Sequence, residues 1–445
     1  MVHAAQNMRA SDPYLARFED TFEREGASRG PAWLYPIRKA GISRFAEIGL
    51  PTPQQEDWRF TNVAPIGRLP FKPLWAPSDA TIKLEQFQFA KLPASRMVFV
   101  NGHYSPKLST ILPQESGVQL RSLTEALSSD GAVLQKYLGR FAKADENGFS
   151  ALNTAFFTDG AFIHVPAGKT VREAVHLMFI ATTTEAGAAI HPRNLIVAEP
   201  NSKLTLIESY FSTVQSAYVT NAIDEFVVGD NAVIEHCKFQ DESRTAYHVA
   251  SQYLHLGRGA NVISHSFAFG AKLSRNNIRA TLAGEGLDCI LNGLYITRDE
   301  QLADHHMIVE HAKPHCNSHE YYNGILDDRS KGVFHGRILV QQEAQKTDAK
   351  QTNKNLLLSD DATIDTKPQL EIYADDVKCT HGATVGQLND ESIFYLRARG
   401  IGIDTARRIL IHAFAGEIID RVRCEPLREE LDRLVWDRLE DNPHL

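Results

Sequence analysis

Short runs of alternating apolar and polar residues, separated by turn residues, dominate the chain between residues 151 and 390. The turns recur at separations of 29, 28 and 27 residues, at Pro200, Gly229, Gly257 and Gly284. Each turn is followed by an alternating run, which reads LTLIES, AVIEHC, NVISHS or DCILNG. A repeat built from strands without intervening helices is typical of a solenoid, because one rung cannot bury its own apolar face.

We therefore predict a mainly β protein whose core, residues 151–390, is a parallel β-helix. A β-sandwich is the competing fold, since short strands with turns every ~8–12 residues also suit it. The recurring turn chemistry favours the β-helix.

Helical periodicity flanks this core on both sides. Residues 13–49 and 123–141 carry apolar side chains at helical spacing, and MVFVNG at 97–102 is typical of a short strand entering a turn. Residues 1–150 are therefore expected to form a mixed, mostly helical N-terminal region.

Residues 391–445 are expected to form a C-terminal helical region. Asp404 or Thr405 is expected to cap a helix that runs to about Arg423. Pro426 is expected to end it and to precede a second amphipathic helix. The predicted apolar stripes are Ala406, Ile409/Leu410, Ala413/Phe414, Ile418 and Val422 for the first helix, and Leu427, Leu431, Leu434/Val435 and Leu439 for the second. These helices can close an end of the β-helix, dock a partner, or do both.

Composition narrows the function classes. The 445 residues carry a net charge of -8, which argues against a general nucleic-acid binder. The N-terminus shows no apolar segment typical of a signal peptide, and no run of apolar residues is long enough to span a membrane. The five cysteines are far apart, odd in number and without a CxxC pair, which indicates a reducing cytoplasm and an incomplete cluster ligand set.

Cys379 and His381, within VKCTHGATVGQL at 377–388, are the first candidates for chemistry. Two residues apart on a strand, they point to the same face. A thiolate and an imidazole on one face suit iron, copper or zinc. The alternative is a buried cysteine and a hydrogen-bonded histidine at a sheet edge.

A second candidate is DHHMIVEHAKPHCNSHE at 304–320, where His311, His315 and Cys316 are the potential metal ligands. The HExxH motif is absent, and no phosphate-binding loop or nucleophile motif occurs elsewhere. A self-sufficient metal-binding β-helix enzyme centred on this segment therefore stays open. Paired carboxylates at turns, Asp327–Asp328 and Asp360–Asp361, also leave a carbohydrate-active enzyme open.

Four separate segments are similar to one known family. They are EDWRFTNVAPI (56–66), FVNGHYSP (99–106), the long block 333–388 that ends in DDVKCTHGATVGQL, and FYLRARGI (394–401). Together they resemble the SufB/SufD family of iron–sulfur cluster assembly proteins. The SufB branch carries an Asn-Cys-x-x-Cys segment where this chain reads NKNLLLSDD (353–361), and His-Glu-Ala-Thr where it reads HGAT (381–384). The chain therefore resembles the SufD branch.

The resemblance implies a right-handed parallel β-helix between helical termini, and a non-catalytic subunit of the SufBCD scaffold that helps iron enter a new cluster. It implies a heterodimer with SufB, with Cys379 and His381 facing that partner and sharing transient iron or an iron–sulfur cluster that this chain does not hold alone. A homodimer is the expected alternative pairing in isolation. It also implies that the ATPase SufC docks on the C-terminal helices, on Phe394, Tyr395, Leu396, Arg399, Arg407, Leu410 and Phe414.

Overall fold

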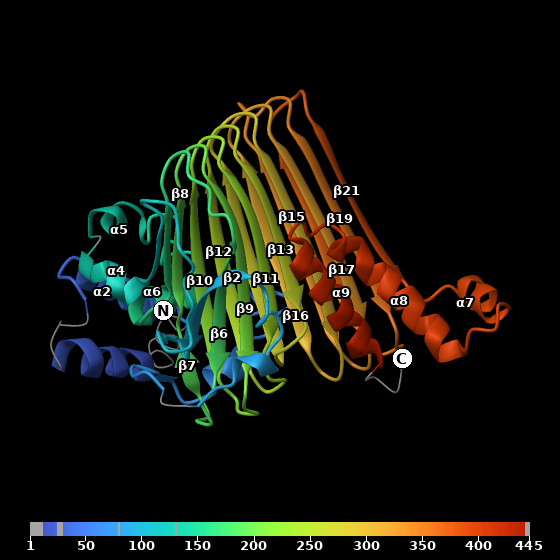
Figure 1. Cartoon of the computed structure of the whole chain (residues 1–445), viewed down its shortest axis with the longest axis horizontal. Coiled ribbons are helices and arrows are strands. Elements are labelled where there is room, and N and C mark those ends of the chain that lie inside the picture. Colours follow the sequence, from blue (N-terminus) through green and yellow to red (C-terminus); the bar gives the residue numbers. More distant parts are fainter. Residues whose placement is uncertain (1–11, 25–29, 79–80, 130, 441–445) are drawn as a thin grey trace.

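The computed structural model describes residues 12–24, 30–78, 81–129 and 131–440 (Figure 1). The start of the chain, on which the expectation of no signal peptide rests, lies largely outside these ranges. Two parallel sheets face each other and form a β-helix of about eight turns, with helices at both ends of the chain. The mainly β fold class and the parallel β-helix are thus confirmed.

Each rung places one strand in each sheet. The 11-stranded sheet contains, in spatial order, β20 (Thr363–Ile372), β18 (Lys331–Val340), β16 (Leu302–His311), β14 (Leu273–Leu282), β12 (Tyr247–Leu256), β10 (Val219–Val228), β8 (Arg193–Ala198), β5 (Ala161–Val165) and β4 (Gln119–Ser122); β7 (Ala188–Ile190) also pairs with β10, and β1 (Lys72–Pro73) pairs with β7. The 10-stranded sheet contains β21 (Lys378–Gly386), β19 (Asp348–Leu357), β17 (Asn317–Leu326), β15 (Asp288–Thr297), β13 (Asn261–Ala268), β11 (Val233–Asp241), β9 (Lys203–Ser212), β6 (Ala174–Ala181), β2 (Ala94–Val100) and β3 (His103–Tyr104). The strand expected at 97–102 is therefore β2, which pairs in parallel with β6 and extends the β-helix before residue 151.

The predicted turns stack directly on one another. The Gly229 amide donates to Ala198, the Gly257 amide to Val228 and the Gly284 amide to Leu256, at 2.7–3.1 Å. A Cβ on Gly284 would lie 2.1 Å from the Arg258 backbone nitrogen, so the turn tolerates only glycine there. The column of turns thus sets the spacing of the rungs.

Apolar side chains from both sheets pack against one another in the space between the sheets. Val228 and Leu256 from one sheet meet Leu204, Ile234 and Val262 from the other, all of them buried. Because alternate residues of a strand face opposite ways, each inward residue is followed by one on the outer face.

The C-terminal helices cover part of the outer face of the 10-stranded sheet (Figure 1). They are α8 (Ile403–Ile419) and α9 (Glu425–Glu440), and α7 (Asp390–Arg397) stands apart from the sheets. The apolar stripe predicted for α9 is confirmed, with Leu427, Leu431, Val435 and Leu439 buried.

The details expected of α8 were wrong in two respects. Its N-cap is Gly402 without a side-chain cap, and the helix ends at Ile419, short of Arg423. Ile411 and Ala415 are buried against the sheet, whereas Leu410 and Phe414 are half-buried. Pro426 lies in the first turn of α9, where its missing amide costs no hydrogen bond.

The N-terminal region packs against the opposite end of the β-helix (Figure 1). Its longer helices are α2 (Leu34–Ile48), α4 (Leu123–Ser129), α5 (Gly131–Tyr137) and α6 (Gly148–Phe156); shorter ones are η1 (Glu19–Arg24), η2 (Glu56–Trp58), α3 (Ala64–Gly67) and η3 (Leu84–Gln86), and residues 12–18 are also helical. Asn147 caps α6 by accepting from the amides of Phe149 and Ser150. None of the described helices combines the length and apolar character needed to cross a membrane.

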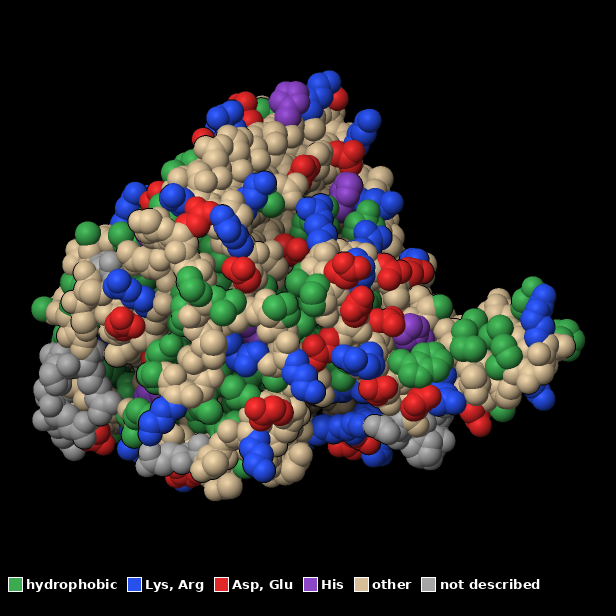
Figure 2. Space-filling model, viewed as in Figure 1, with side chains coloured by type: hydrophobic (Ala, Val, Ile, Leu, Met, Phe, Trp, Pro, Cys, Tyr) green, Lys and Arg blue, Asp and Glu red, His purple; other side chains and the backbone are tan. Residues whose placement is uncertain are grey.

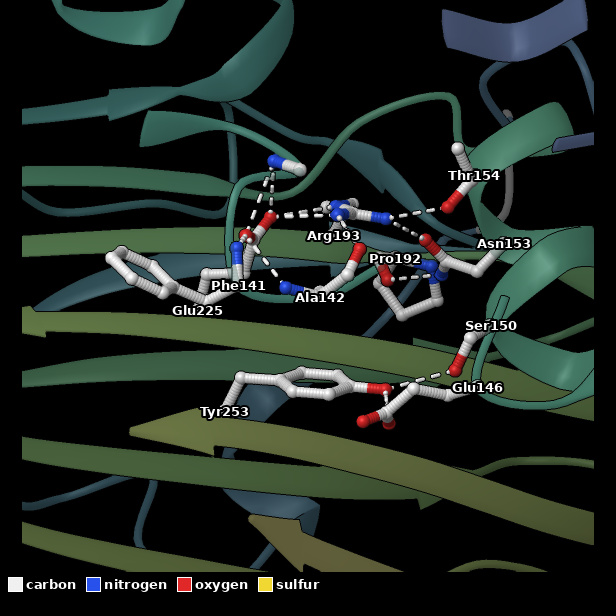
Figure 3. A network of polar contacts seen from close by, with 11 residues as sticks. Phe141, Ala142, Glu146, Ser150, Asn153, Thr154, Pro192, Arg193, Glu225 and Tyr253 are labelled. Carbon is white, nitrogen blue, oxygen red and sulfur yellow. Dashed lines mark hydrogen bonds and ion pairs between the residues drawn. The ribbon is translucent and has the colours of Figure 1, made fainter. Parts of the chain in front are cut away.

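A buried ion pair ties this region to the first rungs (Figure 3). Glu225 on β10 and Arg193 on β8 are 2.7 Å apart and fully buried. The Glu225 carboxylate also accepts from the amides of Gly139 and Ala142, so it orders the segment between α5 and α6. Arg193 additionally donates to Asn153 on α6.

We expect Glu225→Ala to lower the free energy of unfolding by about 3–5 kcal/mol, because it leaves the Arg193 charge buried without its partner. Glu300→Ala is the matched control, since the Arg329–Glu300 pair is largely exposed and should contribute less than ~1 kcal/mol. Chemical denaturation followed by circular dichroism measures both changes. Equal losses for the two variants would contradict the role given to the buried pair.

Candidate functional site at the open end of the β-helix

The last rung leaves the end of the β-helix open. β20 and β21 each pair with one neighbour, β18 and β19, so within the described chain each keeps one free edge. Most of β21 is exposed, in contrast to the strands of earlier rungs. A free parallel edge presents unpaired amides and carbonyls to a further strand.

Cys379 and His381 both lie on this terminal strand. Cys379 is aligned with Ala349 on β19 and packs on a small apolar cluster that includes Ile338. His381 is aligned with Gln351 and is exposed. Strand alternation places both residues on the side of β21 that continues the interior of the β-helix, as the two-residue spacing predicts.

The Cys379 thiol is not activated by its surroundings. Burial raises the pKa of this half-buried thiol, and the nearby Asp348 carboxylate raises it further. At neutral pH the group is therefore a neutral thiol. It becomes a thiolate when a metal ion or a cationic group comes close.

The interior behind His381 is polar. The row that contains His381 continues through Gln351 to Glu320 on β17. Burial raises the pKa of Glu320 to about 8, and the adjacent Gln351 only partly offsets that effect. Glu320 is therefore largely protonated at neutral pH. It lies on β17, two strands away from the free edge of β21.

Exposed apolar side chains gather at the same end of the chain. Ile372, Tyr373 and Val385 lie on or beside the last rung, and Phe394, Tyr395 and Ile403 lie on α7 and the start of α8. Figure 2 shows hydrophobic side chains on the projecting α7 region. Clustered exposed apolar groups of this kind mark interaction surfaces.

The predicted docking residues divide into two sets. Phe394 and Tyr395 on α7 are 73% and 57% exposed, and the Arg399 guanidinium stacks 3.5 Å from the Tyr395 ring centroid. Arg407 is exposed and Leu396 is half-buried. Leu410 and Phe414 are half-buried, and Phe414 packs against the apolar cluster beneath α8.

The candidate ligands of the 304–320 segment are not brought together. His311 is buried, with its Nε2 2.8 Å from the Ser318 hydroxyl. His315 is exposed at a turn with φ of 60°, and the Cys316 thiol donates to the Gly284 carbonyl. Within the described residues these three belong to no group of metal ligands, so the structure does not support a metal site formed by them.

The described residues instead contain a different group, Asp57, His306 and His335, whose ligand atoms all lie within 4.8 Å of one another. The sequence offered one signal for part of it: His306 and His335 occupy equivalent positions of adjacent rungs. Asp57 comes from a remote segment, and its approach to the sheet has no sequence signal.

Comparison with known proteins settles the family. The model of the SufBD core domain of the SUF system for FeS cluster assembly matches residues 179–414, and the model of the SufBD protein N-terminal region matches residues 8–177. The chain belongs to the SufBD family.

Curated SufBD relatives are similar along nearly the whole chain. The iron–sulfur cluster assembly protein SufD of Escherichia coli is 32% identical over 96% of each chain, and that of Bacillus subtilis is 26% identical over 95% of this chain and 96% of its own. An iron–sulfur cluster assembly SufBD family protein of Synechocystis is 35% identical over 89% of each chain.

We expect Cys379 in this SufBD chain to be alkylated slowly by iodoacetamide at neutral pH, with a rate that still rises above pH 9. The reason is that only the thiolate reacts, and the pKa of Cys379 is raised. Peptide mass spectrometry measures the rate, with the same cysteine in the denatured chain as the control. Faster alkylation in the folded chain at pH 7 would contradict a raised pKa.

Proposed function

We propose that this chain is a non-catalytic, SufD-type subunit of a cytoplasmic SufB–SufC–SufD scaffold, in which it helps iron enter a cluster assembled at the interface with SufB. The observation that carries the proposal is the open last rung, where one exposed strand at a free sheet edge bears both Cys379 and His381. Membership of the SufBD family and similarity to curated SufD proteins support the assignment.

Pairing with SufB uses the free edges of β20 and β21. A partner strand satisfies the unpaired amides and carbonyls there, and the exposed Ile372, Tyr373 and Val385 supply apolar area for the contact. In the absence of SufB, two copies of this chain pair through the same edges as a homodimer.

Iron or a nascent cluster is cargo shared across this interface. Cys379 supplies a thiolate once the metal displaces its proton, and His381 supplies an imidazole from the same face of the strand. Two ligands are too few to hold a cluster, so SufB completes the set and this chain alone holds none firmly.

SufC docks on the C-terminal helices through α7. Phe394 and Tyr395 provide the apolar anchors, and Arg399 and Arg407 provide positive charge around them. Leu396, Leu410 and Phe414 support these anchors from half-buried positions. ATPase activity belongs to SufC, and this chain transmits the movement of its partner to the interface.

The ligand role is tested by co-purifying the chain with SufB and SufC and assaying iron and sulfide on the complex. We expect Cys379→Ser or His381→Ala to lower the bound iron at least about ten-fold, because one ligand is lost. The matched control is Thr380→Ala, which alters the opposite face of the same strand. Wild-type iron content in both ligand variants would exclude them from ligation.

The docking role is tested separately by Phe394→Asp, which places a charge on the most exposed apolar residue of α7. We expect SufC affinity to fall by roughly 2 kcal/mol or more, as for a central interface aromatic, with pairing to SufB unchanged. Glu391→Gln on the same helix is the control, and binding is measured by isothermal titration calorimetry. Unchanged SufC affinity in Phe394→Asp would show that SufC docks on a different surface.

A further inference from the structure

Three potential metal ligands from remote segments meet on the outer face of the 11-stranded sheet. They are Asp57 on η2, His306 on β16 and His335 on β18. The His306 Nε2 lies 3.6 Å from an Asp57 carboxylate oxygen, and the two imidazole rings cross edge-on with centroids 4.3 Å apart. None of them belongs to the cysteine site on β21.

The fold holds these residues together from both sides. His306 and His335 are direct neighbours across the β16–β18 pairing. Asp57 lies between two anchors, because Trp58 is buried with its ring 3.7 Å from the Arg275 guanidinium, and Glu56 pairs with Lys367 on β20 at 2.6 Å. The N-terminal segment thus carries a carboxylate to the two imidazoles.

Three of the cationic side chains nearby have an acidic partner. Arg275 pairs with Asp304, Arg337 with Glu371 and Lys367 with Glu56. These pairs reduce the repulsion that a cation bound beside Asp57 would meet, and the Asp57 carboxylate is itself half exposed.

Both imidazoles are buried, whereas Asp57 is exposed. The packing of the sheet therefore fixes the two rings beside a carboxylate that solvent can reach.

An amide from the next strand orients one of the rings. The Gln369 side-chain oxygen lies 2.9 Å from Nε2 of His335. The amide oxygen only accepts, so the proton lies on Nε2 and the Nδ1 lone pair is free. A hydrogen bond from the far nitrogen of a ligating histidine to a fixed acceptor is the arrangement common in metal sites.

We propose that Asp57, His306 and His335 bind one divalent transition-metal ion, Fe²⁺ or Zn²⁺, at a site separate from the assembly site on β21. Two imidazoles and one carboxylate suit both ions, and water completes the coordination. Metal–ligand bonds of about 2.0–2.2 Å allow two donor atoms of one site to lie up to roughly 4.2 Å apart. The 3.6 Å between the Asp57 oxygen and the His306 nitrogen is within that limit. A small side-chain movement brings the other donor atoms, which lie within 4.8 Å of one another, into range. A cleft of about 380 Å³ lined by Asp57, Trp58, Arg275 and His306 gives access.

The full-length chain, stripped of metal by a chelator, is titrated with Co²⁺ and followed by visible absorption. Competition with Zn²⁺, and with Fe²⁺ without oxygen, then gives the preferred ion. We expect one equivalent per chain, with no thiolate-to-cobalt charge-transfer band. Asp57→Asn should weaken binding at least about ten-fold, and Gln369→Leu by about ten-fold through loss of ring orientation.

His319→Asn is the matched control, because His319 faces Asp348 at 3.7 Å outside this group. Because Asp57 is exposed, its variant tests the site even where His306 or His335 variants misfold. Absence of saturable binding, or wild-type affinity in Asp57→Asn, would overturn the site. A charge-transfer band that disappears in Cys379→Ser would place the ion on β21 instead; that outcome rejects this site while supporting the proposed cluster role.

Discussion

Hydrogen bonding between successive rungs is the constraint on which the rest of this structure depends. From β9 to β21 each strand pairs in parallel with its counterpart one rung away, with continuous register across nearly its whole length. Equivalent residues therefore stack in rows. The turn column, the polar row from Glu320 to His381 and the pair formed by His306 and His335 all follow from this register.

The same constraint gives the β-helix two ends, and the chain treats them differently. At the first rungs, β4 pairs antiparallel with β5 and β3 pairs antiparallel with β2, which ends the parallel pairing of the sheets. Buried polar contacts such as Arg193 with Glu225 hold the N-terminal helices against these strands. At the last rung, α8 and α9 return along the outer face of a sheet and leave the edges of β20 and β21 free. An edge left free in this way presents unpaired amides and carbonyls.

The two candidate metal-binding places on this chain differ in chemistry. Cys379 and His381 are partly or fully exposed at an edge, and the raised pKa of the thiol keeps it neutral until a metal arrives. Asp57, His306 and His335 offer only nitrogen and oxygen donors, and packing fixes the two imidazoles. The first arrangement suits cargo that must leave with a partner. The second suits an ion that stays and joins the N-terminal segment to the sheet.

Local patterns were sufficient to predict the rungs, the apolar stripe of α9 and the shared face of Cys379 and His381. Each depends on a repeat along the sequence: every second residue in a strand, about every 3.6 residues in a helix, or one position per rung of the β-helix. The strand and helix periods follow from backbone geometry. The ends of the stripe predicted for α8 are confirmed, since Ala406, Ile418 and Val422 are buried, but its middle was not predictable in this way. That helix is apolar on more than one side, and the small Ala415 allows it to approach the sheet on a face that the pattern does not distinguish.

The sequence by itself therefore determined the β-helix, its helical ends and the residues of the terminal strand. Only the tertiary structure decided that His311, His315 and Cys316 point to separate surroundings while His306 joins His335 and Asp57. The physical reason is that His311 ends β16 while His315 and Cys316 lie in the turn that follows, and that the partner of His306 comes from a segment whose position depends on the burial of Trp58. Contacts set by packing between remote segments leave no period in the sequence.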